Sequence, residues 1–209
     1  MKKILIVLLA FPLIGRAGEF DETKESGKLQ LGMRTIFSSF SDDGYNGFGI
    51  GGHFRLKLGS RLNTEWFADY ITTDIGGLAK RTDYHVGWAV QFYPLNNVIA
   101  KGKFTPFVAA GHCFDYTEVE KSTFGGLKVS RWSSAVSSGL GCHYNIADNF
   151  DITLSGLYMM HLGREINASV FKGPNDEPEV IITEEDAALE GHLLLSLSLN
   201  VYIADLWGK

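Results

Sequence analysis

Apolar and polar residues alternate along most of this chain, from Leu29 to Ile203. The pattern is clearest near the C-terminal end, where leucine occupies every second position from Leu193 to Leu199. A period of two places successive side chains on opposite faces of a β-strand, whereas an amphipathic helix repeats every ~3.6 residues. The sequence therefore predicts an all-β protein whose strands each have one apolar and one polar face.

Eight segments carry this alternation, and their connections differ in length. The segments are Lys28–Phe40, Phe48–Leu58, Leu62–Thr73, Asp83–Tyr93, Phe104–Thr117, Lys128–Tyr144, Asp151–Leu162 and Gly191–Ile203. The connections Gly59–Arg61 and Asn145–Asn149 are short, whereas Gly163–Glu190 and most of the others are longer and polar. Short turns at one end and long loops at the other are typical of an eight-stranded antiparallel up-and-down transmembrane β-barrel.

Alternation alone does not say whether the apolar face points into the barrel or out of it, because a soluble lipocalin-like barrel has the same period with its apolar face inside. Three features favour the membrane. The polar face mixes both charge signs with glycine and serine, which suits a narrow, filled lumen. Tyrosine and tryptophan gather toward the strand ends, as in interfacial girdles. The segments also have the length of a tilted bilayer crossing.

The N-terminal residues have the features of a signal peptide spanning residues 1–17. Lys2 and Lys3 precede an apolar stretch, and Gly15 and Ala17 stand at the −3 and −1 positions of a cleavage site. The stretch is shorter than the ~20 residues that an uncleaved helical anchor needs. We therefore expect export, followed by a barrel domain spanning residues 28–203.

Charge and cysteine content narrow the possible functions. The net charge of −5 argues against a nucleic-acid partner. The two cysteines, Cys113 and Cys142, have no metal-site spacing. We place Cys113 inward near the loop end of its strand and Cys142 outward near the turn end, which is too far apart for a disulfide. Both are therefore expected to be free thiols.

Two segments carry a resemblance to a known family. Thr105–Gly111 opens one strand, and Ser138–Phe150 has the order strand, tight turn, strand. With the signal peptide, these segments make the chain resemble the OmpA/OmpX-type small outer-membrane barrels over essentially all of its mature length. The resemblance implies the fold and location in the cell outer membrane, but no particular activity. It departs from the family where Asp205–Lys209 trails the last strand, because such barrels often end on an aromatic residue, and here that residue would be Tyr202 or Trp207.

Polar residues on the inward faces form a candidate lumen network. A tight turn at Gly59–Arg61 sets Arg55 nearly opposite Glu65, and we expect these two to pair in a salt bridge. The complete candidate network is Arg34, His53, Arg55, Lys57, Glu65, Asp69 and His85. The favoured interpretation is a structural plug that fills the lumen, and the alternative is an ion-selective pore.

Sites for catalysis or metal binding are not expected. His112 lies on the lipid-facing register, and Ser134 would lie nearly opposite it if the hairpin closes around Thr123; no carboxylate is placed to orient the pair. His85, His143, His161 and His192 fall on different strands and levels, without ligand spacing. We therefore expect no catalytic residues, no metal and no cofactor.

The function expected from the sequence is a non-enzymatic one. The protein would support membrane integrity, adhesion or host contact through long surface loops, as a monomer in contact with outer-membrane lipid, lipopolysaccharide and the barrel-insertion machinery. One alternative is a lipid-modifying enzyme of the lipid A acyl hydrolase type, and another is a narrow channel for small solutes. The sequence decides the fold more firmly than the activity.

Overall fold

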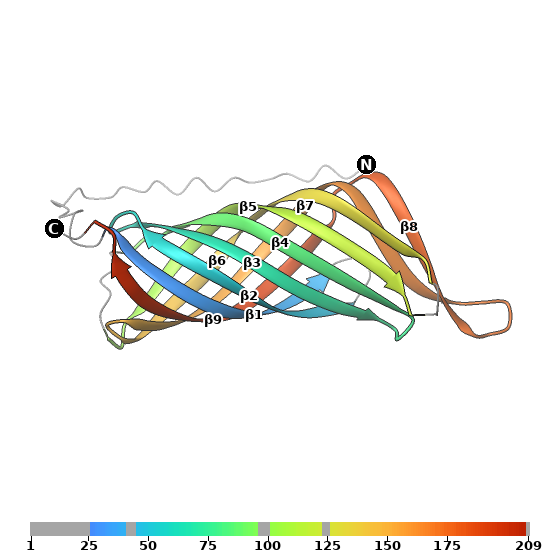
Figure 1. Cartoon of the computed structure of the whole chain (residues 1–209), viewed down its shortest axis with the longest axis horizontal. Helices are drawn as coiled ribbons and strands as arrows, with labels where there is room; N and C mark the ends of the chain where they lie inside the picture. The colour runs from blue at the N-terminus through green and yellow to red at the C-terminus, as the bar shows by residue number, and fades with distance from the viewer. Residues whose placement is uncertain (1–25, 41–44, 96–100, 123–125, 208–209) are drawn as a thin grey trace, which may run out of the picture.

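A computed structural model describes residues 26–40, 45–95, 101–122 and 126–207. The expected signal peptide and its cleavage site lie outside these residues. The described residues form nine strands, shown in Figure 1. They are β1 (Lys28–Phe40), β2 (Asn46–Lys57), β3 (Leu62–Ile75), β4 (Ala79–Phe92), β5 (Phe104–Lys121), β6 (Lys128–Ala147), β7 (Phe150–Lys172), β8 (Pro178–Ala188) and β9 (Gly191–Asp205). Among the described residues, no helix has the length and apolarity to cross a bilayer.

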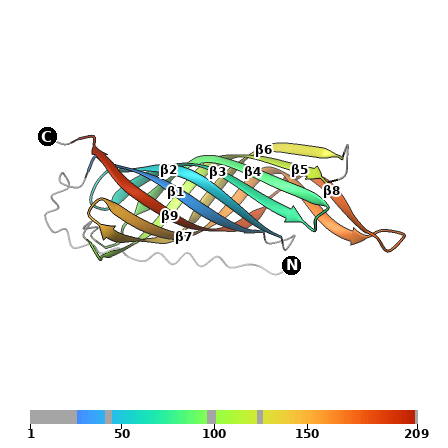
Figure 2. The ribbon, with the colours of Figure 1, turned by 60° about the horizontal axis from the view of Figure 1, so that its bottom comes forward.

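Eight of these strands close into an antiparallel up-and-down barrel. Each strand from β1 to β7 pairs with the next, and β9 closes the cylinder between β1 and β7. Lys28 pairs with Asp205 at one end, called here the near end, and the β7–β8 hairpin projects at the opposite, far end (Figures 1 and 2). Closure removes free strand edges, as a protein in lipid requires.

The ninth strand corrects one expectation from the sequence. The segment from Gly163 to Glu190 is not a loop throughout: β7 continues ten residues beyond Leu162 to Lys172 and pairs there with β8. Gly163 adopts a φ of 128° at the point where the β7–β8 register shifts. This hairpin lies beyond the barrel wall, where no lipid covers it and only one small apolar face packs against other strands. The alternation of apolar and polar residues along it is therefore weaker than along the membrane strands.

The burial pattern is inverted relative to a soluble barrel. Met33 is 73% exposed on the outer wall, whereas Arg55 is 1% exposed in the lumen. The large apolar side chains of β1, β2, β3, β4 and β9 alternate outward in the same way. A water-soluble protein rarely exposes so continuous an apolar surface, so the outer wall suits lipid.

Aromatic contacts mark both ends of this apolar wall. A row perpendicular to the strands joins Tyr70, Tyr84, Tyr116 and Trp132 near the far end, with centroid separations of 5.2, 6.0 and 4.9 Å. Phe104 contacts Tyr144 near the other end, at 4.7 Å. Phe104 and Tyr116 are both in β5 and twelve residues apart, which is roughly 40 Å along the strand and roughly 30 Å along a barrel axis tilted by about 40°. That span matches the hydrocarbon core of a bilayer.

Glycines on the inner wall make room for the polar lumen. A Cβ at Gly51 would collide with the Asp69 carboxylate on β3, and one at Gly32 would collide with Asn200 and His53. The glycines therefore let charged side chains lie flat against the wall of a narrow cylinder.

Candidate functional site: the barrel lumen

The near end of the lumen is organised around Arg55. Its guanidinium donates to Asp151 Oδ2 at 2.5 Å and to Thr153 Oγ1 at 3.2 Å, both on β7. His143 Nδ1 lies 2.8 Å from the same guanidinium. His53 Nε2 lies 2.6 Å from Asn200 Oδ1, and the Asn200 amide in turn donates to Asp151. Lys57, also buried, borders a small void in this layer.

The second layer is built on Arg34. Its guanidinium donates to Glu65 Oε1 at 2.8 Å and forms a two-pronged pair with Asp69. The same group lies over the ring of Phe67, 4.4 Å from its centroid. Gln91 donates to the other Glu65 oxygen at 2.7 Å. Each charge in this layer therefore has a partner of opposite sign or an aromatic face.

The expected Arg55–Glu65 salt bridge is wrong, although the expected register is right. Arg55 and Glu65 are direct register partners between β2 and β3. Their ion pairs nevertheless go to other strands, Arg55 to Asp151 and Glu65 to Arg34. The lumen is narrow and the strands are tilted, so a long side chain reaches the far wall as easily as its neighbour.

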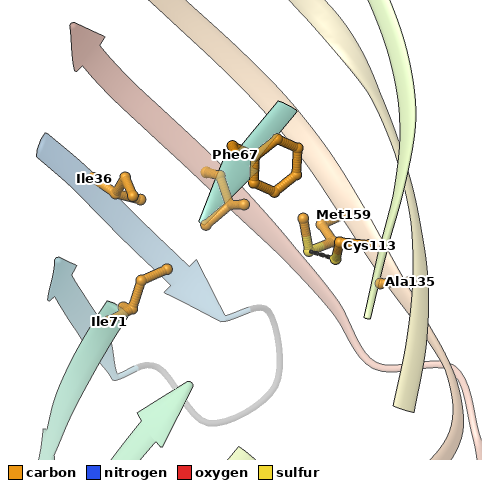
Figure 3. Packing of buried hydrophobic residues seen from close by; sticks show 7 residues of the cluster. Ile36, Phe67, Ile71, Cys113, Ala135 and Met159 are labelled. Atoms are coloured by element: carbon orange, nitrogen blue, oxygen red, sulfur yellow. Dashed lines mark hydrogen bonds between the residues drawn. The ribbon is translucent and has the colours of Figure 1, made fainter. Parts of the chain in front are cut away.

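An apolar layer lies between these two layers and the far end. Figure 3 shows the side chains of this layer from close by. Its buried members are Ile36, Phe67, Ile71, Cys113, Ala135, Met159 and Leu194. The Cys113 thiol lies 3.7 Å from the Met159 sulfur. The voids between lumen side chains in the first and second layers each measure only about 10 Å³, roughly the space of one water molecule. The described lumen is thus packed by side chains.

The far layer combines ion pairs with histidines. The Glu190 carboxylate forms an ion pair with Arg81 at 2.5 Å and another with Arg131. One carboxylate therefore connects the β4 and β6 parts of the wall. Asp83 accepts hydrogen bonds from the Arg81 guanidinium at 3.0 Å and from the Thr117 hydroxyl at 2.8 Å. Below them, Asp115, His85, His161 and His192 fill the space above the apolar layer, and all four are 0–1% exposed.

The structure brings together three histidines that were expected on different levels of the barrel. One nitrogen from each of His85, His161 and His192 lies within 4.8 Å of the other two. Their strands β4, β7 and β9 are far apart in sequence, and strand stagger in the closed barrel brings the three positions to one level. His143, by contrast, lies in the near layer. Among the residues that the structure describes, these three could therefore hold a metal ion, and sequence spacing carried no signal for them.

The His112–Ser134 contact is present on the outer wall. His112 Nε2 lies 2.6 Å from Ser134 Oγ, although the true register partner of Ser134 is Phe114, two residues further along β5. Within the described chain, no carboxylate contacts the second nitrogen of His112. The surrounding backbone is paired in the β5–β6 ladder, so it offers no pair of free amides as an oxyanion hole.

The two cysteines are free, in line with their expected positions. Cys113 is opposite Ala135, and Cys142 lies seven residues further along β6, roughly 23 Å away at about 3.3 Å per residue.

A closed barrel of eight antiparallel strands, with an apolar outer wall and a charged, filled interior, defines the class of small transmembrane barrels of the OmpA/OmpX type. The fold is therefore that of an outer-membrane barrel. Among solved structures, the chain is similar to Neisserial surface protein A, with a TM-score of 0.58 and 13% identity over 84% of this chain and 96% of that one.

Two other solved barrels show the same likeness. A major outer membrane protein from Thermus thermophilus has a TM-score of 0.54 and 12% identity over 84% of this chain and 98% of that one. The attachment invasion locus protein Ail of Yersinia pestis, solved with the heparin analogue sucrose octasulfate, has a TM-score of 0.51 and 15% identity over 85% and 99%. No protein-family model and no curated protein matches the sequence. At these identities the likeness concerns the fold alone.

Proposed function

We propose that this protein is a non-enzymatic barrel of the outer membrane whose far end displays an ordered surface outside the cell. The observation that carries the proposal is a second hydrophobic core at the far end. Ile75, Ala79 and Val119 from the β3–β4 and β5–β6 hairpins are buried there against Ile166, Ala168 and Val180 of the β7–β8 hairpin. Such packing holds three hairpins as one platform.

The filled lumen supports display rather than transport. An ion crossing the barrel would meet three layers of paired charges, with an apolar layer before the last of them. Desolvating an ion against such an apolar layer is costly. Among the described residues, therefore, nothing favours the channel alternative, and nothing supplies the orienting carboxylate or the oxyanion hole that the hydrolase alternative needs.

The surroundings of the protein follow from the same proposal. The apolar wall contacts lipid, and the far-end aromatic row lies at the level of the outer-leaflet headgroups, which include lipopolysaccharide. The near end, where β1 begins and β9 ends, faces the periplasm, and insertion depends on the barrel-insertion machinery. The closed sheet leaves the barrel able to function as a monomer.

Protease cleavage in intact cells tests the orientation. A cleavage site is inserted in the β7–β8 turn, between Gly173 and Glu177, and a matched control site in the near-end turn, between Ala147 and Phe150. We expect external protease to cut only the far-end site, in a protein that sediments with outer membranes and migrates faster before boiling than after. Cleavage of the near-end site alone would reverse the orientation and overturn the proposal.

A truncation tests the display function. Residues 164–188 are replaced by a short Gly-Ser turn, which removes the hairpin and leaves the eight barrel strands. If display is the function, the truncated protein stays in the outer membrane, and cells that carry it lose surface attachment or envelope resistance to the same degree as cells that lack the gene. If cells that carry the truncated protein keep full surface attachment and envelope resistance, the proposal is contradicted.

A further inference from the structure

We propose that His85, His161 and His192 form a binding site for one divalent transition-metal ion, with zinc as the best fit. The side chains come from β4 and from the paired strands β7 and β9 on another part of the wall, and they converge in the lumen. Their ring centroids form a triangle with sides of 5.9, 5.8 and 4.9 Å. Imidazole nitrogen is a preferred ligand of zinc, copper and nickel, and a poor one for magnesium or calcium.

The spacing of the inner nitrogens fits a tetrahedral ion. His161 Nε2 and His192 Nε2 lie 3.2 Å apart. Two ligands at a zinc–nitrogen distance of about 2.0–2.1 Å and tetrahedral angles are roughly 3.3–3.4 Å apart. One nitrogen of His85 lies within 4.8 Å of one nitrogen on each of the other two rings. Movement of the His85 ring toward them would complete a three-histidine set, with one further position for a water molecule.

The Nδ1 atoms of His161 and His192 already have the kind of polar partner that the second ring nitrogen of a metal-bound histidine has. His161 Nδ1 lies 3.1 Å from Asp115 Oδ2, and His192 Nδ1 lies 3.1 Å from Ser38 Oγ. Metal-ligating histidines almost always engage their second nitrogen with a carboxylate, carbonyl or hydroxyl, which fixes ring orientation and tautomer. These contacts direct both Nε2 atoms toward the same point.

The buried ring nitrogens of His85 provide an independent observation in favour of a bound ion. Both of its ring nitrogens are buried and have no hydrogen-bond partner among the described residues, although Nε2 lies 3.3 Å from an Asp115 oxygen. Buried polar atoms are nearly always satisfied, and the exceptions call for a specific explanation such as an ion. A metal ion at the centre of the triangle satisfies one of these nitrogens directly.

The charge around the site also favours a cation. Asp83, Asp115 and Glu190 contribute three negative charges, and Arg81 and Arg131 contribute two positive ones. With neutral imidazoles, these five groups carry a net charge of −1. A divalent ion would therefore enter an environment with an excess of negative charge.

The proposed ion joins β4 to two strands that do not pair with it. β4 pairs with β3 and β5, whereas β7 and β9 pair with each other on another part of the wall. Coordination would tie these walls together beneath the far-end platform. Because all three histidines are buried, the ion would be bound as the barrel folds, and its binding free energy would add to folding stability.

Metal content after refolding tests the site. The full mature chain, without an affinity tag, is unfolded in urea with chelator and refolded into detergent with Zn²⁺ or Co²⁺, and loosely bound metal is removed by gel filtration. We expect about one Zn²⁺ per folded barrel, and with Co²⁺ the intense visible absorption of a tetrahedral complex. Refolded protein without stoichiometric zinc, or cobalt in an octahedral spectrum only, would overturn the proposal.

Single-site variants separate this site from other histidines. His161→Ala and His192→Gln should each lower bound zinc at least tenfold, while His53→Ala, which removes a different buried lumen imidazole, and His112→Ala on the outer wall should bind as wild type does. The heat-dependent gel shift identifies the folded fraction, and metal is counted only in that fraction. Equal zinc in the His161→Ala, His192→Gln and wild-type barrels would show adventitious binding and sink the proposal.

Thermal stability gives a second readout. Zinc should raise the unfolding temperature of the wild-type barrel and of His53→Ala, and should leave that of His161→Ala unchanged. A zinc-dependent rise of equal size in His161→Ala would place the metal elsewhere.

Discussion

Arg55 and Glu65 are register partners across the β2–β3 hairpin, yet neither neutralises the other: Arg55 donates to Asp151 on β7, and Glu65 accepts from Arg34 on β1. Ion pairing in this lumen therefore links opposite walls rather than adjacent strands. The stability of the closed cylinder depends on these cross-lumen pairs, because each one is buried and screened little by water.

Removing Asp151 should be more harmful than removing Glu65. Asp151→Ala leaves the Arg55 guanidinium without its carboxylate, and breaking a buried pair typically costs about 3–5 kcal/mol. Glu65→Ala should cost less, because Arg34 keeps its two-pronged pair with Asp69. Urea unfolding from lipid vesicles measures both.

A second substitution tests the assigned partners. Adding Arg55→Met to Asp151→Ala removes the uncompensated charge and should restore much of the lost free energy of unfolding, whereas adding it to Glu65→Ala should not. Rescue of Glu65→Ala instead would mean that Arg55 pairs with its register partner after all.

The outer wall should tolerate charge only near its ends. Leu197 is half exposed in the middle of β9, and Ile203 is equally exposed near its end. Leu197→Arg should cost about 2–4 kcal/mol in lipid vesicles, and Ile203→Arg about 0–1 kcal/mol, because the cost of a cation falls toward the interface. Equal costs at the two positions would contradict the proposed placement of the bilayer.

The far-end platform should depend on one face of β8. Val180 is 8% exposed within the second core, and the adjacent Ile181 is 44% exposed on the other face. Val180→Asp buries a carboxylate without a partner and should make the β7–β8 turn sensitive to limited proteolysis, while the barrel keeps its heat-dependent gel shift. Ile181→Asp is the matched control and should leave the turn as resistant as in wild type; equal sensitivity of the two variants would argue against a packed platform.

The apolar layer should keep the lumen closed to ions. We expect wild-type protein in planar bilayers to show no steady conductance. Replacing both Phe67 and Met159 by alanine empties much of the layer, at a cost of several kcal/mol in packing, and should produce conductance events in the fraction that still folds. Steady conductance of the wild-type protein at the same protein density would favour the channel hypothesis over display.

Local chemistry was enough to predict the barrel strands and their faces from the sequence. Side chains alternate with a period of two whatever the strand pairs with, so the pattern alone places Met33 and Arg34 on opposite faces. The aromatic residues at the strand ends and the strand lengths then indicated that Met33 points outward, as it does. The tight turn at Gly59–Arg61 also determined the Arg55–Glu65 register, because few residues separate the two strands. The β7–β8 hairpin was missed because strands outside the membrane carry a weaker apolar alternation.

Only the closed tertiary structure decided which inward side chains meet. The pairing of Arg55 with Asp151 joins residues 96 positions apart, and the three-histidine cluster joins β4 to β7 and β9. These contacts depend on the stagger that accumulates as eight tilted strands close into a cylinder, and this stagger is a property of the whole sheet. The sequence by itself determined that the lumen is polar, and the tertiary structure decided that it is filled and that three of its histidines converge on one point.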